Sequence, residues 1–148
     1  GIGFDNDLSC ITSSEKNLKW IQGIYNPKAS YRLINSDSRQ VLKFVSKVDC
    51  VATEPYMGPF MKSYPTEGEA KRIMKELVPL YQELVRVLAK VTKHRIVIVT
   101  PIFIAKSRER FILDLEPTLR KLNLKFEEPI PYKSPTSRIL RLIWVIHK

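Results

Sequence analysis

The sequence predicts an α/β protein with a doubly wound, mostly parallel sheet that closes with a C-terminal antiparallel hairpin. Short apolar runs alternate with segments whose apolar residues recur at helical spacing, as in consecutive strand–helix units. Residues 94–101, HRIVIVTP, form an almost continuous apolar run, which is typical of a strand buried on both faces of a parallel sheet. The last two apolar segments have no helix between them, so they are expected to pair antiparallel.

In the first part of the chain, the expected elements end at recognisable residues. Asp5 ends the first strand, Gly23 is the expected C-terminal stop of the first helix, and Asn26-Pro27 indicates a loop. The expected strands are 1–4, 31–35 and 48–53, and the expected helices are 7–22 and 39–45.

The rest of the chain continues this alternation. Thr66-Glu67-Gly68-Glu69 is typical of a helix start, and the apolar spacing after it runs to Val91. The remaining expected elements are a strand at 94–101, a helix at 108–122, and final strands at 124–130 and 138–148 joined by a polar loop at 131–137. A single domain over residues 1–148 is expected, because a chain of 148 residues can bury one sizeable core but not two ordinary ones.

The composition argues against several classes of protein. The longest nearly apolar run, 96–105, is too short to span a membrane, and no basic-then-apolar leader opens the chain. Cys10 and Cys50 are far apart in strand or helix patterns, which favours small buried residues in a reducing compartment over a disulfide framework or a metal site. We therefore expect a cytoplasmic protein with no membrane partner and no metal.

The positive charge is concentrated in the second half of the chain. Residues 1–85 contain 11 Lys and Arg against 10 Asp and Glu, whereas residues 86–148 contain 14 against 5. This asymmetry favours a polyanionic partner, nucleic acid above all. A basic surface without such a partner explains the charge alone equally well.

Polar residues follow four of the predicted strands at the point where each strand ends. These strand ends are Asp5, Asp37-Ser38, Glu54-Pro55-Tyr56 and Thr100-Pro101. Ligands of doubly wound sheets bind at the carboxyl ends of the strands, where a carboxylate can accept hydrogen bonds from ribose hydroxyls or from an adenine amino group. Taken singly, Asp5 can instead cap the next helix, and Asp37 can be a turn or capping residue. Taken together, the acids favour a ligand that contains a nucleoside.

The loop that begins with Glu54-Pro55-Tyr56 combines an acceptor, a rigid kink and an aromatic ring. A carboxylate can hold an exocyclic amine, and a tyrosine ring can stack on the base that carries this amine. The alternative is an ordinary turn whose tyrosine packs on the edge of the sheet. That alternative gives no role to the acid, so we favour a base-binding loop.

Four segments, GIGFDND, NLKWIQ, INSDS and VDCVATEPYMG, together resemble class I S-adenosylmethionine-dependent methyltransferases. More narrowly, they are similar to the RNA methylases that modify guanine N2 in tRNA through a DPPY-type loop, often with an attached THUMP domain. The resemblance covers the chain from the family's second strand to its seventh. It implies a Rossmann-like fold and makes residues 1–148 the C-terminal part of a catalytic domain. The family's glycine-rich cofactor loop, with the first strand and helix around it, would precede Gly1, so the fold is expected to be N-terminally truncated.

The resemblance also implies roles for individual residues. Asp5 and Asn6 match the position that holds the cofactor ribose, and Asp37 and Ser38 match the pair that meets the adenine. Glu54, Pro55 and Tyr56 match the catalytic loop, with Glu54 also beside the cofactor, S-adenosylmethionine. No metal is implied. This loop departs from the family pattern, because the family has an aspartate and usually two prolines where this chain has Glu54 and a single proline.

Other residues are assigned by their setting in the sequence. Gly58, Lys133 and Arg138 are expected to contact RNA, and Arg141 could also meet phosphates, although a solvated basic edge accounts for these cations as well. The roles of Tyr64 and Tyr132 are left open. Trp20 and Trp144 lie in apolar patterns and are expected in the core, and His94 and His147 are expected to be surface or packing residues.

The first hypothesis is therefore a methyltransferase acting on an exocyclic amine of an RNA base, most consistently guanine N2 in tRNA. The alternatives are a catalytically inactive RNA-binding partner with the same fold, and a methyltransferase for adenine N6 or a protein glutamine. The expected partners are tRNA or another structured RNA, together with a second chain or an upstream segment that completes the sheet.

Overall fold

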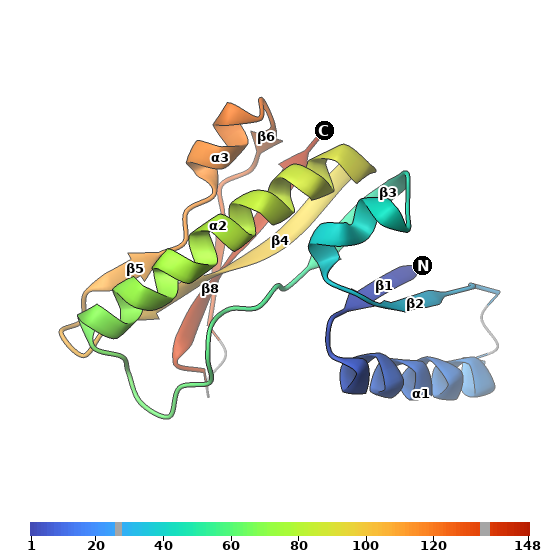
Figure 1. Cartoon of the computed structure of the whole chain (residues 1–148), viewed down its shortest axis with the longest axis horizontal. Coiled ribbons are helices and arrows are strands. Elements are labelled where there is room, and N and C mark those ends of the chain that lie inside the picture. The colour runs from blue at the N-terminus through green and yellow to red at the C-terminus, as the bar shows by residue number, and fades with distance from the viewer. Residues whose placement is uncertain (26–27, 134–136) are drawn as a thin grey trace. The chain divides into compact units, whose positions relative to one another are not determined.

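The computed structural model describes residues 1–25, 28–133 and 137–148. These residues form two compact units, Gly1–Ser46 and Lys47–Lys148, and each unit is described by itself (Figure 1). The predicted loop at Asn26-Pro27 and residues 134–136 of the predicted loop at 131–137 lie outside the described residues.

The N-terminal unit is built on a two-stranded parallel sheet. Its elements are β1 (Ile2–Asp5), α1 (Leu8–Tyr25), β2 (Arg32–Asn35) and the 3-10 helix η1 (Ser38–Lys43). The register pairs Asp5 with Asn35, so the carboxyl ends of the two strands lie at one edge of this sheet. Its buried hydrophobic residues are Ile34, Val41 and Val45.

Helix α1 has no buried residue, and three expectations for it are wrong. Trp20, expected in the core, is 64% exposed, and Cys10 is also exposed. An 18-residue helix is about 27 Å long, whereas strands of four residues extend only about 13 Å, so this small sheet cannot cover the whole helix. The helix also continues past Gly23 to Tyr25, because Gly23 does not adopt the positive φ of a C-terminal stop.

The C-terminal unit contains a six-stranded sheet. The strand order is β3-β4-β8-β6, with β5 paired to β4 and β7 paired to β8. Its elements are β3 (Val48–Thr53), α2 (Glu67–Val91), β4 (Thr92–Ile104), β5 (Arg110–Ile112), α3 (Glu116–Lys121), β6 (Lys125–Phe126), β7 (Ile130–Tyr132) and β8 (Ile139–His147).

This sheet is mixed, which corrects the prediction of a mostly parallel sheet. Only the β3–β4 pair is parallel, whereas β4 pairs antiparallel with β5 and β8, and β8 pairs antiparallel with β6 and β7. The antiparallel arrangement expected for the end of the chain is thereby confirmed. The additional strand β5 arises where a helix was predicted over 108–122. Arg108 turns the chain with a φ of 72°, Phe111 pairs with Phe103, and a short α3 begins only beside Pro117, since proline is tolerated in the first turn of a helix.

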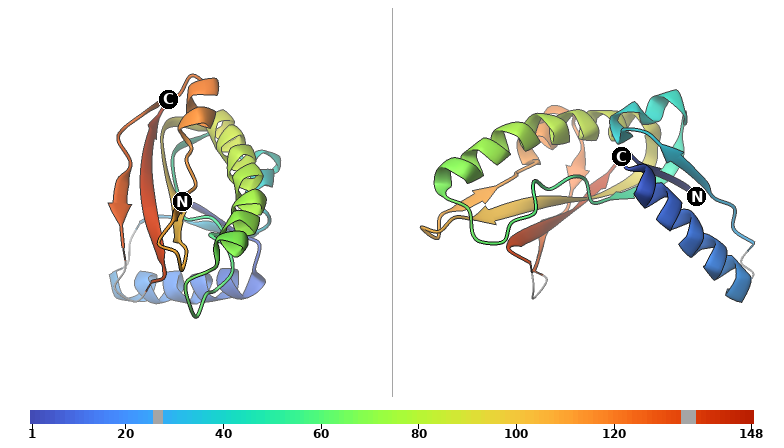
Figure 2. Two further views of the ribbon diagram at one scale, coloured as in Figure 1. Left: turned by 90° about the vertical axis from the view of Figure 1, so that its left-hand side faces the viewer. Right: turned by 60° about the horizontal axis from the view of Figure 1, so that its bottom comes forward.

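One face of the sheet packs against α2, which runs along its length (Figures 1 and 2). The predicted helix start is confirmed, because Thr66 and Glu69 form a reciprocal capping box. The predicted core position of Trp144 is also confirmed: it is 2% exposed, and its Nε1 donates to Thr100 Oγ1 at 2.9 Å. The buried side chains of this layer include Ile73, Leu77, Tyr81, Leu84 and Leu88 on α2 and Ile96, Ile98 and Ile146 on the sheet.

On the opposite face of the sheet, side chains of β3 are exposed to solvent. Cys50, expected to be buried, is exposed, and so is Ala52. Both residues point to the face away from the one that α2 covers, because Cys50 lies beside Arg95 and Ala52 beside Val97 in the parallel register. Within the described residues β3 pairs on one side only, with β4, so it is an edge strand.

Candidate functional site

The loop after β3 begins with Glu54, whose carboxylate is held by an arginine of the last strand. Arg141 Nε donates to Glu54 Oε1 at 3.0 Å. Arg141 is itself oriented by its pairing opposite Pro101 and by a 3.1 Å hydrogen bond from its Nη1 to Ser137 Oγ. The Glu54 side chain remains 49% exposed, and within the described residues only its Oε1 has a hydrogen-bond partner. Its other oxygen is therefore available to a further donor.

Tyr56 presents an aromatic ring two residues beyond this carboxylate. The residue is 59% exposed, more than a tyrosine packed on the edge of the sheet would be. An exposed aromatic ring next to a charged acceptor suits a flat ligand that carries a hydrogen-bond donor. Pro55 lies between the two residues and restricts the backbone that joins them.

Gly58 anchors the same loop against the core. Its φ is +98°, and a Cβ at this position would lie 3.1 Å from Ile73 Cγ2 and 3.2 Å from Phe103 Cζ. Only glycine combines this backbone conformation with so close an approach to α2 and β4. Gly58, expected to contact RNA, therefore has a structural reason to be glycine that is independent of RNA.

Basic side chains gather around the following part of the loop. The guanidinium of Arg138, the residue before β8, lies 5.3 Å from the centre of the Tyr64 ring, which adds a second contact to the Glu54–Arg141 pair. Tyr64 also lines a shallow pocket of about 200 Å³, whose charged lining residues are Lys62, Arg72, Lys106 and the acidic Glu69. Arg138 and these three cations could contact the phosphates of a bound nucleic acid.

Lys133, the other predicted RNA contact, is exposed just after β7, next to the exposed Tyr132. No hydrogen bond or ion pair joins Lys133 to the described residues, in contrast to the engaged Arg141.

Beneath this loop lies a buried hydroxyl that the sequence did not reveal. Tyr81 on α2 is fully buried, and its Oη has no hydrogen-bond partner among the described residues. Burial raises the pKa of Tyr81, and the negative charge of Glu54 raises it further. The phenol is therefore neutral at physiological pH. No pattern in the sequence indicated that this core tyrosine lies close enough to Glu54 to feel its charge.

The N-terminal unit contains the other predicted site residues. Asp5 ends β1, and its Oδ1 accepts a hydrogen bond from the backbone N–H of Asp7 at 2.8 Å. This turn leaves the second carboxylate oxygen of Asp5 without a partner in the part of the chain that the structure describes, and Asn6 beside it is exposed. Asp5 therefore both forms a turn and keeps an acceptor for a ligand.

Asp37 is more fully engaged than Asp5. It caps η1, because its Oδ1 accepts from the backbone N–H of Arg39 at 2.8 Å, and the Arg39 side chain donates to both carboxylate oxygens. These hydrogen bonds with Arg39 hold the pKa of Asp37 below its usual value. Ser38 begins the 3-10 helix directly after it. The capping role considered for Asp37 is thus present, and a ligand amine would have to share this carboxylate with Arg39.

The described ranges contain no group of three or more His, Cys, Asp or Glu side chains that could hold a metal ion. No helix there is long and apolar enough to cross a membrane. Of the two histidines, His147 lies 2.7 Å from Glu127 Oε1, and His94 is exposed at the start of β4.

Comparisons with solved structures show that the fold is similar to that of methyltransferases. The chain is similar to TrmN from Thermus thermophilus, with a TM-score of 0.56 and 16% identity over 99% of this chain and 36% of that one. It is also similar to magnesium protoporphyrin IX methyltransferase (ChlM) from Synechocystis PCC 6803, solved with bound SAM, with a TM-score of 0.58 and 14% identity over 97% of this chain and 58% of that one.

A third similar structure is SMU.1697c from Streptococcus mutans in complex with SAH, with a TM-score of 0.54 and 8% identity over 99% of this chain and 75% of that one. No family model and no curated protein matches the sequence. The chain thus spans about a third of TrmN and just over half of ChlM. At these identities the likeness concerns the fold and not the activity.

Proposed function

We propose that this chain is part of the catalytic domain of a methyltransferase that acts on an exocyclic amine of an RNA base, guanine N2 in tRNA. The observation that carries the proposal is the loop after β3, where the exposed Tyr56 ring follows a carboxylate held in place by Arg141. The methyltransferase fold and the excess of positive charge in residues 86–148 support an RNA-modifying activity.

In this proposal the chain acts mainly by orientation. The Tyr56 ring stacks on the flipped base, and the free oxygen of Glu54 accepts a hydrogen bond from the exocyclic amine. Together they direct the lone pair of the nitrogen, and the proton that the nitrogen loses passes to solvent. S-adenosylmethionine would supply the sulfonium methyl group. Holding the two reactants in line can lower the barrier by several kcal/mol, roughly 7–11 in the best cases, without a strong base.

The strand-end residues of the N-terminal unit fit parts of this cofactor unequally. Asp5 and Asn6 suit the ribose, because Asp5 keeps one acceptor oxygen without a partner among the described residues. Asp37 and Ser38 would meet the adenine, where Arg39 already occupies the carboxylate. Binding of the adenine amine at Asp37 therefore requires that Arg39 moves away or that the Asp37 carboxylate accepts from both the amine and Arg39.

The edge strand β3 supports a further part of the proposal, a strand supplied from outside these 148 residues. Its backbone is unpaired on one side within the described residues, and Cys50 and Ala52 lack cover. An exposed edge with apolar side chains readily pairs with another strand. A second chain or an upstream segment that carries the glycine-rich loop would complete both the sheet and the cofactor pocket.

A second candidate is an RNA-binding partner subunit without turnover. Both acceptors that the enzyme needs are engaged by arginines, Glu54 by Arg141 and Asp37 by Arg39. Acceptors that are already held in this way favour the same RNA contacts without methyl transfer.

Two measurements separate the candidates. Calorimetric titration of S-adenosylmethionine into the chain, with Asp37→Ala as the control, tests the cofactor site. Transfer of a labelled methyl group to tRNA, followed by digestion to nucleosides, then tests the reaction and identifies the modified base. The proposal expects N2-methylguanosine with the wild type, a large loss with Tyr56→Ala, and substantial activity with Tyr56→Phe, which keeps the stacking ring.

The results that would contradict the enzyme proposal are equally specific. Tyr56→Ala with full turnover would remove the loop from the mechanism. Methyladenosine as the product would reassign the target to adenine. RNA binding without cofactor binding, even after a glycine-rich segment is supplied, would establish the second candidate.

A further inference from the structure

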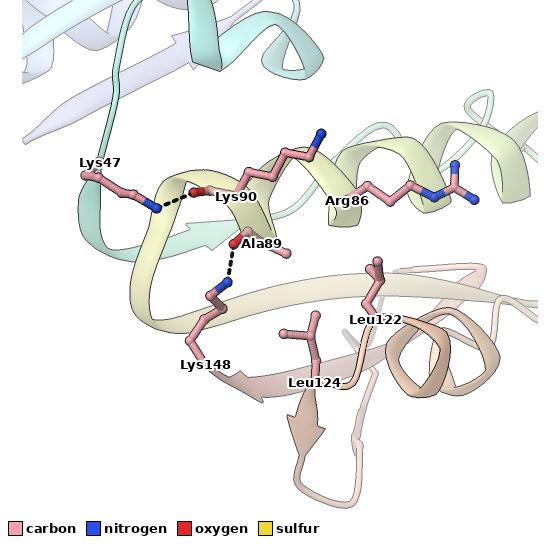
Figure 3. Close-up of a pocket in the computed structure, with 7 residues that line it drawn as sticks. All are labelled: Lys47, Arg86, Ala89, Lys90, Leu122, Leu124 and Lys148. Atoms are coloured by element: carbon pink, nitrogen blue, oxygen red, sulfur yellow. Dashed lines mark hydrogen bonds between the residues drawn. The ribbon is translucent and has the colours of Figure 1, made fainter.

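A basic pocket lies at the end of the sheet opposite the Glu54 loop. It has a volume of about 500 Å³. The residues that line it are Lys47, Arg86, Ala89, Lys90, Leu122, Leu124 and Lys148 (Figure 3). Four of these seven are basic and none is acidic. Lys47 precedes β3 and Glu54 follows it, so the length of this strand separates the pocket from the candidate base-binding loop by on the order of 20 Å.

Two of the lysines are fixed by the last turn of α2. Lys47 Nζ donates to the Lys90 carbonyl at 2.7 Å, and Lys148 Nζ donates to the Ala89 carbonyl at 2.6 Å. Figure 3 shows both ammonium groups converging on the helix end from different segments of the chain. An ammonium group has three N–H donors, so each lysine keeps two for a ligand.

The helix end reduces this positive charge only slightly. The C-terminus of a helix carries about half a negative charge, against four positive side chains, which leaves roughly +3.5 in the pocket. Arg86 and the Lys90 ammonium group are exposed, and neither makes an ion pair within residues 1–25, 28–133 and 137–148. The pocket therefore has the chemistry of an anion site, with two cations that lack any counter-charge there.

A second group of basic side chains lies on the other face of the sheet. Arg95 of β4 and Lys125 of β6 both pair in register with His147 of β8, and Arg95 lies beside Cys50 on the face away from α2. This row is therefore separate from the pocket, which residues of α2 line.

We propose that the pocket binds the phosphodiester backbone of an RNA strand. This inference rests on the RNA partner of the proposed function but not on methyl transfer. A stacked strand that advances about 3.4 Å per nucleotide spans the distance from the pocket to Glu54 in about six nucleotides. The half-buried Leu122 and Leu124 supply an apolar floor beside the cations, suited to a ribose ring.

The test compares two double variants of the same helix by fluorescence anisotropy with a labelled RNA of about 20 nucleotides. Arg86→Gln/Lys90→Gln removes the two pocket cations that make no ion pair with the described residues. It leaves Lys47 and Lys148, which donate to the carbonyls at the end of α2, unchanged. Lys71→Gln/Lys75→Gln is the matched control, because it removes the same charge from exposed positions nearer the helix start. Losing two phosphate contacts should weaken binding about 25-fold in 0.1 M salt and lower the salt slope by about 1.4, with less than a twofold change in the control.

Each outcome has a distinct meaning. Equal losses in the two double variants, or an unchanged salt slope, would overturn the pocket as an RNA site. A polyglutamate peptide that binds as tightly and shows the same loss would assign the pocket to an acidic protein segment instead. No RNA binding by the wild type would refute both the pocket and the proposed RNA partner. Pocket-dependent RNA binding with no methylated nucleoside, even after a glycine-rich segment is supplied, would refute only the enzyme proposal.

Discussion

Replacing Gly58 with alanine tests whether the loop after β3 is held in one conformation by the core. A side chain at φ +98° costs about 1–3 kcal/mol, because L-residues rarely adopt this backbone conformation. The new Cβ would also lie 3.1 Å from Ile73 and 3.2 Å from Phe103, both of which are buried. Overpacking of this kind costs about 1–3 kcal/mol. We therefore expect a loss of roughly 2–6 kcal/mol in the free energy of unfolding.

Gly68→Ala is the matched control for this substitution. Gly68 lies in the first turn of α2, and a Cβ there would meet nothing within 4 Å. Alanine at this position should stabilise the protein by up to about 1 kcal/mol, because it forms helix better than glycine does. The same chemical change is thus expected to have opposite signs at the two sites.

The assay is chemical denaturation followed by tryptophan fluorescence. Trp144 is 2% exposed and reports unfolding of the C-terminal unit, whereas Trp20 is already 64% exposed and should change little. Because Gly58 follows Tyr56 by two residues, methyl transfer or RNA binding should fall with Gly58→Ala even where the protein remains folded. A Gly58→Ala protein within about 0.5 kcal/mol of the wild type would refute the tight packing of this loop.

Three further substitutions probe the same contacts. Tyr81→Phe should stabilise the protein by about 1 kcal/mol, because it removes a buried hydroxyl without a described partner. The folded-state pKa of this tyrosine is raised, so the free energy of unfolding of the wild type should fall as the pH rises above 10.0, whereas that of Tyr81→Phe should not fall for this reason. A Tyr81→Phe protein that is less stable than the wild type would instead reveal a partner for the hydroxyl. A double-mutant cycle of Glu54→Gln and Arg141→Met should give a coupling free energy of about 0.5–1 kcal/mol, since Glu54 is half exposed; no coupling would mean that the pair does not form in solution. Asp37→Ala should cost about 1 kcal/mol through the lost cap of η1. The pKa of Asp37 is lowered from 3.8, so this cost should be full above that pH and shrink as the pH falls through the lowered folded-state pKa; circular dichroism showing a constant difference down to about pH 2 would contradict this.

The elements that the sequence predicted well are those defined by local chemistry. The strand at 48–53 agrees with β3, and the helix expected from Thr66 to Val91 agrees with α2 within one residue. A capping box and a 3.6-residue apolar period depend only on nearby residues, so they can be recognised without the rest of the fold.

The errors arise where a distant partner decides the structure. Phe111 fits a helical period with Leu115 and Leu119, but Phe103 recruits it into strand β5. The apolar patterns around Trp20 and Cys50 predicted burial, yet both residues are exposed. Periodicity shows which side of an element is apolar and does not show what packs against it.

The candidate site follows the same rule. Tyr56 is exposed after a strand end, and its role in binding a base stays a prediction. The ion pair between Glu54 and Arg141 joins residues 87 apart and leaves no trace in one sequence. The pairing of Asp37 with Arg39 is different, because the two lie only two residues apart. An arginine placed there could have indicated that Asp37 has a partner of its own.

The central strand β4 has a consequence for how the C-terminal unit opens. It continues directly from α2 at Thr92 and exchanges backbone hydrogen bonds with β3, β5 and β8. An amide N–H of β4 bonds to only one neighbour, so opening of β3 frees the amides that face it, while the amides that bond to β8 stay protected until the unit unfolds. Deuterium exchange at these amides should therefore report the global free energy of unfolding, while the amides of the edge strand β3 exchange through smaller openings. The edge offered to another strand is also the part of the sheet that opens most readily.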